Sequence, residues 1–247
     1  MGMDDKNVSP QQDRHGQKLE ALLEAARAVL EYSRFADSAR AIFDQAKKIT
    51  GATAGYVALL SETGEENEVL FLDAGGQDCT VDPSLPMPIR GLRSESYAKK
   101  ATVYDNDFLN SEWLQYLPEG HVPMQNVLFA PLIIEGKAVG IMGLANKPSD
   151  FTEDDARMAT AFGDFAAVAL NNSWNLEKLQ DTVNHLQEAL AEVKTLKGII
   201  PICCVCKKIR DDRGYWSQLE AYIHKHSDAD FSHGLCPECE EKLRNEI

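Results

Sequence analysis

The chain has 247 residues, of which 44% are hydrophobic, and a formal net charge of -14 at pH 7. This length suffices for one large domain or two smaller ones with a buried core. The excess negative charge repels phosphate backbones and anionic lipids, so nucleic acid and membrane surfaces are poor candidate partners. No run of about 18 apolar residues is present, and residues 1–16 lack the apolar segment of a signal peptide. We therefore expect a cytoplasmic protein with a disordered leader at 1–16.

Periodicity along the first two thirds of the chain predicts both helices and strands. Apolar residues recur at helical spacing over 17–50, with a break near Tyr32, and predict two helices. A polar turn then separates "AGYVALLS" from "NEVLFLDAGG", which predicts an antiparallel hairpin. A short helix in "LRSESYAKK", a brief strand in "TVYDND" and a second hairpin in "VLFAPLIIEGKAVGIMGLANK" follow. The fold class is therefore α+β, with an antiparallel sheet and helices.

A long exit helix is predicted to begin at "FTEDD", with Thr152 as its N-cap, and to continue to about residue 197. Its second half carries apolar residues at alternating spacings of three and four, as a two-stranded coiled coil requires. These residues are Leu176, Leu179, Val183, Leu186, Leu190 and Val193. We interpret 173–198 as a coiled-coil signalling helix in a parallel homodimer. The alternative is a helix that packs only on its own domain.

Residues 17–172 resemble the GAF family of bacterial sensory domains. "GATAGYVALL", "NVLFAPLIIEGKAVGIMGLANK" and "NKPSDFTEDD" carry the resemblance. The last of these is similar to the Asn-Lys…Phe…Asp-Glu signature of cyclic-nucleotide-binding members, matched by Asn146, Lys147, Phe151 and Asp155. Ala156 stands where that signature has its final acid. The simplest interpretation is that Lys147 and Asp155 form an ion pair that joins a turn to the exit helix.

The resemblance implies a small molecule held between the sheet and its covering loops. The residues do not identify this ligand. A covalent bilin is disfavoured, because Cys79 is followed by Thr80 rather than histidine. His121 could instead be a hydrogen-bonded structural residue, and Trp113 could belong to the core. The candidate ligand-binding residues are Arg93, Tyr97, Trp113, His121 and Asn126.

Five of the six cysteines lie between residues 203 and 239, in "CCVC" and "CPEC". Thiols stay reduced in the cytoplasm, so paired CxxC motifs there indicate metal binding more than disulfides. Residues 199–247 contain few apolar residues, and a segment of this size needs a staple to fold. We predict a structural zinc site in which Cys204 and His233 are possible substitutes. The predicted ligands are Cys203, Cys206, Cys236 and Cys239.

The stretch from "LKGIIPICCVC" to "CPECEEKL" resembles a short module appended to PAS, GAF and receiver domains in bacterial signalling proteins. We expect no enzymatic activity, because kinase, cyclase and phosphodiesterase signatures are lacking and a GAF-type methionine sulfoxide reductase would need a second thiol besides Cys79. The hypothesis is a signal-transduction protein in which a small-molecule sensor acts through a dimeric helix on a zinc-stabilised module that contacts another signalling protein. The alternative is a redox sensor whose C-terminal cysteines respond, with the GAF-like domain as a dimerisation scaffold.

Overall fold

A computed structural model describes residues 10–77, 79–82, 84–192, 200–211 and 213–245. Internal contacts divide the chain into two units, Met1–Lys178 and Leu179–Ile247. Among the described helices, none is long and apolar enough to cross a membrane.

The first unit is built on one sheet of six strands in the order β3-β2-β1-β6-β5-β4, and every neighbouring pair is antiparallel. The two hairpins predicted from the sequence, β1–β2 and β5–β6, are both confirmed. In the second, Glu135 and Gly136 have φ angles of 50° and 75°, as a tight two-residue turn between antiparallel strands requires. The strands are β1 (Ala54–Leu60), β2 (Glu66–Asp73), β3 (Met87–Pro88), β4 (Val103–Asp105), β5 (Val127–Ile134) and β6 (Lys137–Ala145).

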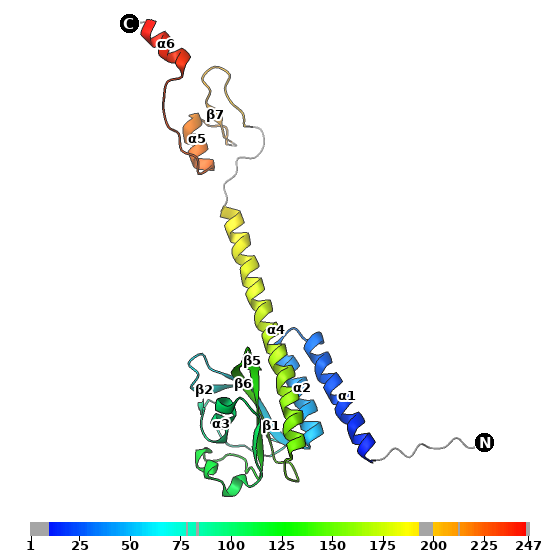
Figure 1. Cartoon of the computed structure of the whole chain (residues 1–247). Helices are drawn as coiled ribbons and strands as arrows, with labels where there is room; N and C mark the ends of the chain where they lie inside the picture. The colour runs from blue at the N-terminus through cyan, green and yellow to red at the C-terminus, as the bar shows by residue number, and fades with distance from the viewer. Residues whose placement is uncertain (1–9, 78, 83, 193–199, 212, 246–247) are drawn as a thin grey trace, which may run out of the picture. The chain divides into compact units, whose positions relative to one another are not determined.

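Two helices cover one face of this sheet (Figure 1), namely α2 (Phe35–Thr50) and the first half of α4 (Glu153–Glu192), and α1 (Pro10–Glu31) packs against α2 on the side away from the strands. The apolar faces of α2 and α4 meet the strands in the larger core, where Phe43, Val57 and Phe162 are fully buried. Helix α2 ends where Gly51 adopts a φ of 78° and its N–H bonds the Lys47 carbonyl. The pair of N-terminal helices predicted from periodicity is confirmed.

Helix α1 begins at Pro10, so residues 10–16, which the sequence assigned to a disordered leader, are helical. Proline suits a helix N-terminus because its missing N–H would have no intrahelical partner there. Arg14 and Lys18 also bring positive charge to Asp154 at the start of α4. These ion pairs tie the first turns of α1 to the domain. Residues 1–9 lie outside the described part of the chain.

The opposite face of the sheet carries a smaller core under α3 (Leu92–Lys99) and the short 3-10 helices η1 (Phe108–Asn110) and η2 (Glu112–Tyr116). Alternation along each strand divides the side chains between the two cores. On β1, Val57 enters the larger core, whereas Tyr56 and Ala58 face α3. The short helix and the brief strand β4 predicted in this region are both confirmed.

Helix α4 is a single helix of 40 residues. Its predicted N-cap is confirmed, because the Asp155 N–H donates to the Thr152 hydroxyl. The apolar residues of the predicted seam are exposed from Leu176 to Leu190, whereas Val193 lies outside the described residues. No partner chain is present, so the coiled-coil interpretation stays a prediction.

The described part of the second unit beyond α4 contains little regular structure. It comprises the two-stranded sheet of β7 (Ile209–Arg210) and β8 (Trp216–Ser217), followed by α5 (Leu219–His226) and α6 (Pro237–Asn245). Among its described residues, Ile209 alone is buried. Tyr215, Trp216, Phe231 and Leu235 are exposed. This segment therefore lacks the apolar burial that stabilises the first unit.

Candidate functional site

Four polar side chains gather under α3, on the face of the sheet opposite α4. Tyr56 comes from β1 and Asn67 from β2, while Arg93 and Tyr97 come from α3. Tyr97 donates its hydroxyl hydrogen bond to the Asn67 side-chain oxygen over 2.6 Å. We call these four residues the polar cluster. Arg93 and Tyr97 were predicted from the sequence as ligand-binding residues.

Two buried atoms of the polar cluster have no hydrogen-bond partner among the described residues: the Tyr56 hydroxyl and the Asn67 side-chain nitrogen. A buried polar group without a partner costs about 1–3 kcal/mol, so such atoms are rare in folded proteins. Asn67 is only 5% exposed, and its oxygen is already occupied by Tyr97. Its unsatisfied amide group can therefore only donate, and the tyrosine hydroxyl beside it can donate as well.

Electrostatics in the polar cluster favour neutral tyrosines beside one fixed positive charge. Burial raises the pKa of Tyr56, and the nearby Arg93 guanidinium opposes this shift without forming a well-aligned hydrogen bond. Burial also raises the pKa of Tyr97, with a further contribution from Tyr56. Arg93 also makes a long contact of 3.4 Å to the Pro88 carbonyl. The polar cluster thus offers two hydroxyls, an amide and a guanidinium.

Apolar side chains surround the polar cluster. Phe129 lies at 6.3 Å from Tyr56 between ring centroids, and Trp113 packs on the same core. Gly143 on β6 makes room for this arrangement, because a Cβ there would lie 2.6 Å from the Tyr56 ring and 3.1 Å from Phe129. Polar groups set among aromatic walls are typical of small-molecule sites.

The other sequence-predicted ligand residues have different surroundings. Trp113 stacks on Tyr116 at 6.5 Å and lies against the smaller core. His121 has its Nδ1 2.8 Å from the neighbouring Val122 carbonyl. The Asn126 amide donates to the carbonyls of Lys147 and Ser149, and its oxygen accepts the Lys147 N–H. The structure thus brings Arg93, Tyr97 and Trp113 to one core and places Asn126 in a separate network.

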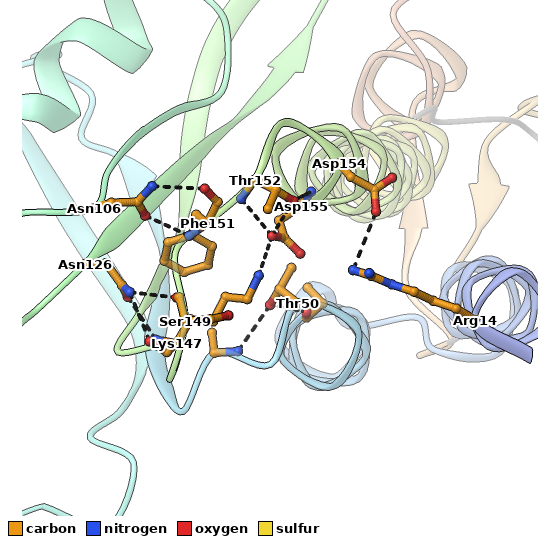
Figure 2. Close-up of polar contacts among 12 residues, drawn as sticks. Arg14, Thr50, Asn106, Asn126, Lys147, Ser149, Phe151, Thr152, Asp154 and Asp155 are labelled. Carbon is orange, nitrogen blue, oxygen red and sulfur yellow. Dashed lines mark hydrogen bonds and ion pairs between the residues drawn. The ribbon is translucent and has the colours of Figure 1, made fainter. Parts of the chain in front are cut away.

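That network joins the ends of β5 and β6 to the start of α4, and we call it the brace (Figure 2). Lys147 pairs with Asp155 over 2.5 Å, and both side chains are nearly buried, so the ion pair predicted from the sequence is confirmed. Asp155 also accepts from the Thr152 N–H and hydroxyl. Asn106 exchanges two hydrogen bonds with the Phe151 backbone. The residues of this chain that match the GAF signature are therefore held by ion pairs and hydrogen bonds within the brace.

The two cysteine pairs each form a compact turn. Lys207 adopts a φ of 61° and donates its N–H to the Cys203 carbonyl, while the Cys203 N–H bonds the Lys208 carbonyl. Backbone N–H groups of Cys206 and Val205 lower the pKa of the Cys203 thiol. The N–H of Cys239 and the thiol of that residue lower the pKa of Cys236 in the same way. Each pair thus favours a thiolate on its first cysteine, which is the form that binds metal.

Among the residues that the structure describes, no group of three or more His, Cys, Asp or Glu side chains could hold a metal ion together. The four predicted zinc ligands are thus present as two preformed pairs rather than as one tetrahedral site. Four thiolates in two CxxC turns fit zinc by donor chemistry and spacing. Cys204 and Cys79 are both exposed.

Tyr56 and Asn67 were not among the ligand-binding residues predicted from the sequence. Tyr56 lies in "AGYVALL", which reads as an apolar strand, and Asn67 is an ordinary polar residue beside a turn. The position of Tyr56 in the strand could have identified it. Because Tyr56 alternates with buried Val57, it had to face the side of the sheet not covered by the long helices.

The fold defines a class of small α+β domain in which one antiparallel sheet carries long helices on one face and α3 with two short 3-10 helices on the other. The family model for the GAF domain matches residues 34–171, more than half of the chain, and the chain belongs to this family. A sensor and signalling role is the role this membership supports.

A methyl sulfide methyltransferase-associated sensor from Methanosarcina acetivorans is 25% identical over 162 residues, which are 63% of this chain. The aligned part is only 16% of that sensor, so the chain spans about a sixth of this curated relative. The GAF domain of a phosphoenolpyruvate-protein phosphotransferase from Coxiella burnetii has a TM-score of 0.57 at 14% identity, over 66% of this chain and 98% of that one.

A free methionine-R-sulfoxide reductase from Neisseria meningitidis, solved with its substrate, has a TM-score of 0.56 at 16% identity, over 70% of this chain and 99% of the reductase. Identities this low establish a shared fold and nothing about a shared ligand or reaction.

Proposed function

We propose that this GAF domain senses a small molecule bearing a carboxylate, which it binds without chemical conversion at the polar cluster. The observation that carries the proposal is the pair of buried donors without partners, on Tyr56 and Asn67. A carboxylate has two oxygens that accept several hydrogen bonds, so one group could satisfy both donors. The Arg93 guanidinium supplies the matching positive charge.

The aromatic side chains around the cluster would cover the rest of the ligand. Phe129 and Trp113 belong to the same core as Tyr56 and Tyr97, so an apolar or planar body attached to the carboxylate would be held there. His121 and Asn126, which the sequence also suggested, are engaged with backbone groups and are not part of this proposal.

The signal would pass through the sheet to α4. Tyr56 faces the ligand, whereas the adjacent Val57 packs in the larger core with α2 and α4. The brace adds a polar connection, because Lys147 after β6 is paired with Asp155 in the first turns of α4. A ligand at the polar cluster would therefore move α4 only if it binds one arrangement of the sheet and α4 more tightly than another.

The C-terminal module would contact a further signalling protein, held in shape by one zinc ion. Cys203, Cys206, Cys236 and Cys239 would be the ligands, and bound zinc would supply structural stability rather than chemistry. The support for this part is the thiolate-favouring turn at each CxxC pair and the near absence of buried side chains among the described residues around them.

A thermal-shift experiment on the full chain tests the sensor proposal, with succinate and glutamate as probes and their neutral amides, succinamide and glutamine, as matched ligands. A probe at about 100 times its dissociation constant adds about 2.7 kcal/mol, which is roughly 5–10 °C for a domain of this size. We expect a carboxylate, and not its amide, to raise the melting temperature. Native mass spectrometry of the purified chain would report any carboxylic acid that is retained.

Substitutions separate the polar cluster from the rest of the domain. Tyr56→Phe and Asn67→Leu should remove the shift. Tyr104→Phe is the matched control, because Tyr104 lies on β4 opposite Leu128, which belongs to the helix-covered core. Equal shifts in Tyr56→Phe and wild type would place the ligand elsewhere. An absence of any shift, together with an empty native mass, would mean that water satisfies the donors and that the proposal fails.

A further inference from the structure

The two donors that carry the proposed function are closed off from solvent. The Tyr56 hydroxyl and the Asn67 side-chain nitrogen are both buried, and Asn67 as a whole is only 5% exposed. A molecule that bears a carboxylate can therefore bond them only after an element that covers the smaller core has moved. The covering elements differ in how firmly the rest of the domain holds them.

Helix α3 is held firmly over this core. Leu92 at its first position is buried in the core. The hydroxyl of Ser96, which is fully buried, lies 3.0 Å from the Ala101 carbonyl oxygen and 3.2 Å from the Phe129 carbonyl oxygen on β5. Moving α3 would leave this hydroxyl without its partners inside the protein, which is costly.

The segment of residues 109–121, which includes η2, covers the same core far less firmly. The structure describes all of residues 109–121, and none of them is buried. Trp113 and Leu117 pack against the core through partly buried side chains, while Leu109 and Leu114 are exposed. Segments with few buried side chains can open at a low cost in free energy while the remainder of a domain stays folded.

Both ends of this segment are anchored and joined, so it can move as one unit. Phe108 and Val122, which flank it, are buried. The Phe108 N–H donates to the Gln125 carbonyl over 2.9 Å and closes the base of the segment. Surface loops of this length with adjacent ends are compact units that frequently have a function of their own.

Hydrogen bonds at two points hold the segment against other parts of the described chain. Arg90 donates to the Tyr116 carbonyl over 3.2 Å, and its guanidinium lies 5.6 Å from the centre of the Tyr116 ring. The Gly120 carbonyl accepts from the N–H and the hydroxyl of Thr80 over 3.2 Å and 3.3 Å. The remaining hydrogen bonds of the segment to described residues stay within 107–122.

We propose that residues 109–121 form a lid that opens to admit the ligand to the polar cluster, and that Arg90 and Thr80 hold this lid closed. The ligand in this inference rests on the proposed function, whereas the opening is a property of the free domain. When the lid opens, Trp113 leaves the core that contains Tyr56. When it closes over a bound carboxylate, it excludes the water that competes for the buried donors.

Amide hydrogen exchange of the full chain without ligand tests the opening. The Thr80 N–H is bonded to the lid, and the N–H groups of Leu114 and Leu117 are bonded within it. We expect these three amides to exchange at least about 100-fold faster than the paired amides of β5 and β6, because they do not require global unfolding. Exchange of the three only at the rate of the β5 and β6 amides would overturn the inference.

Two glycine substitutions provide a matched pair for the contact at Thr80. Gly120 and Gly64 have φ angles of 82° and 75°, so alanine is strained at both. A Cβ on Gly120 would lie 2.3 Å from the Thr80 hydroxyl oxygen, whereas one on Gly64 would meet no atom within 4 Å. Gly120→Ala should speed exchange of the Thr80 amide at least about 10-fold and leave the Phe108 amide unchanged. Gly64→Ala should change neither, and equal effects of the two variants would overturn the inference.

Stopped-flow binding of succinate and glutamate tests the role of the lid in ligand entry. Gly120→Ala and Arg90→Met should raise the association and dissociation rates together, by about 3–10-fold, so that the dissociation constant changes little. Arg34→Met is the control, because the Arg34 side chain is 80% exposed and contacts only its own helix among the ion pairs of the described chain; it should change neither rate.

The two rates separate a lid from a merely distorted site. A faster dissociation with an unchanged association rate in Gly120→Ala would overturn the inference, since a distorted site holds its ligand less well but is entered no faster. Failure of the wild type to bind either carboxylate would contradict the proposed function, and the exchange of the Thr80 amide would still decide whether the lid opens.

Discussion

The GAF domain and the C-terminal module differ in what holds them together. The domain buries two apolar cores on the two faces of one sheet, and its polar groups are largely paired with one another. The described part of the module contains a two-stranded sheet, two short helices and a single buried side chain, Ile209. Apolar burial can account for the first region and cannot account for the second. We therefore expect metal removal to destabilise the module and not the domain, and the loss of a buried contact to destabilise the domain and not the module.

Metal removal should produce the largest effect, and it should be confined to the module. A chelator, or the substitution Cys236→Ser, should unfold the module, because a structural zinc contributes roughly 10–16 kcal/mol in such small units. Elemental analysis and amide exchange of the full chain would measure metal content and local protection together. The GAF domain should retain its melting temperature.

Cys204→Ser is the matched control for the zinc ligands, since it removes an adjacent exposed thiol. We expect it to retain one zinc per chain. Full zinc content in Cys236→Ser would contradict the ligand assignment, and loss of zinc in Cys204→Ser would move it to Cys204. Loss of zinc on mild peroxide treatment, with the domain unaffected, would favour the redox alternative.

Breaking the brace should destabilise the GAF domain and leave the module unchanged. Lys147→Met leaves the nearly buried Asp155 carboxylate without its cation, and removing one partner of a buried ion pair costs about 3–5 kcal/mol. Urea unfolding followed by tryptophan fluorescence would measure the loss. Lys99→Met is the control, because its pair with Glu95 is exposed and should contribute at most about 0.5 kcal/mol.

Equal losses in the two lysine variants would show that the brace is no more than a surface contact. A loss that also removes zinc from the module would mean that the two regions are not independent in stability.

The smallest effect should come from alkaline pH. Burial raises the pKa values of Tyr56 and Tyr97, so these groups contribute stability that is fully present below pH 10, the ordinary tyrosine pKa, and is lost as pH rises above it. The free energy of unfolding of the wild type should therefore fall between pH 8 and pH 11, and the fall should be smaller in Tyr56→Phe. In Tyr104→Phe it should match wild type, and an identical loss in all three would indicate that Tyr56 ionises normally.

Much of the GAF domain could be predicted because its local patterns agree with its tertiary contacts. Alternating strands, the turn at Gly136 and the cap at Thr152 are each specified within a few residues. The pairing of Lys147 with Asp155 was accessible for the same reason. Asn126 was harder to interpret, because its role depends on backbone carbonyls of Lys147 and Ser149 that pattern alone does not position.

The polar cluster was only half accessible for a similar reason. Arg93 and Tyr97 lie one turn apart on a predicted helix, so their proximity is local. Tyr56 and Asn67 reach them through the register of β1 and β2, with a bulge between Val57 and Ala58. Such a bulge changes which residues face one another, and no glycine in β2 marks the extra residue, Leu70.

The alternation of β1 also limits which insertions and deletions the domain can accept. Tyr56 and Val57 are joined by one peptide bond but belong to different cores. A single residue added or deleted at the start of β1 would exchange their faces, placing a hydroxyl among the helices and a valine beside Asn67 and Arg93. The same change in the exposed turn at residues 62–64 would alter neither face. Length variation in this protein should therefore be found in that turn and not in the strand.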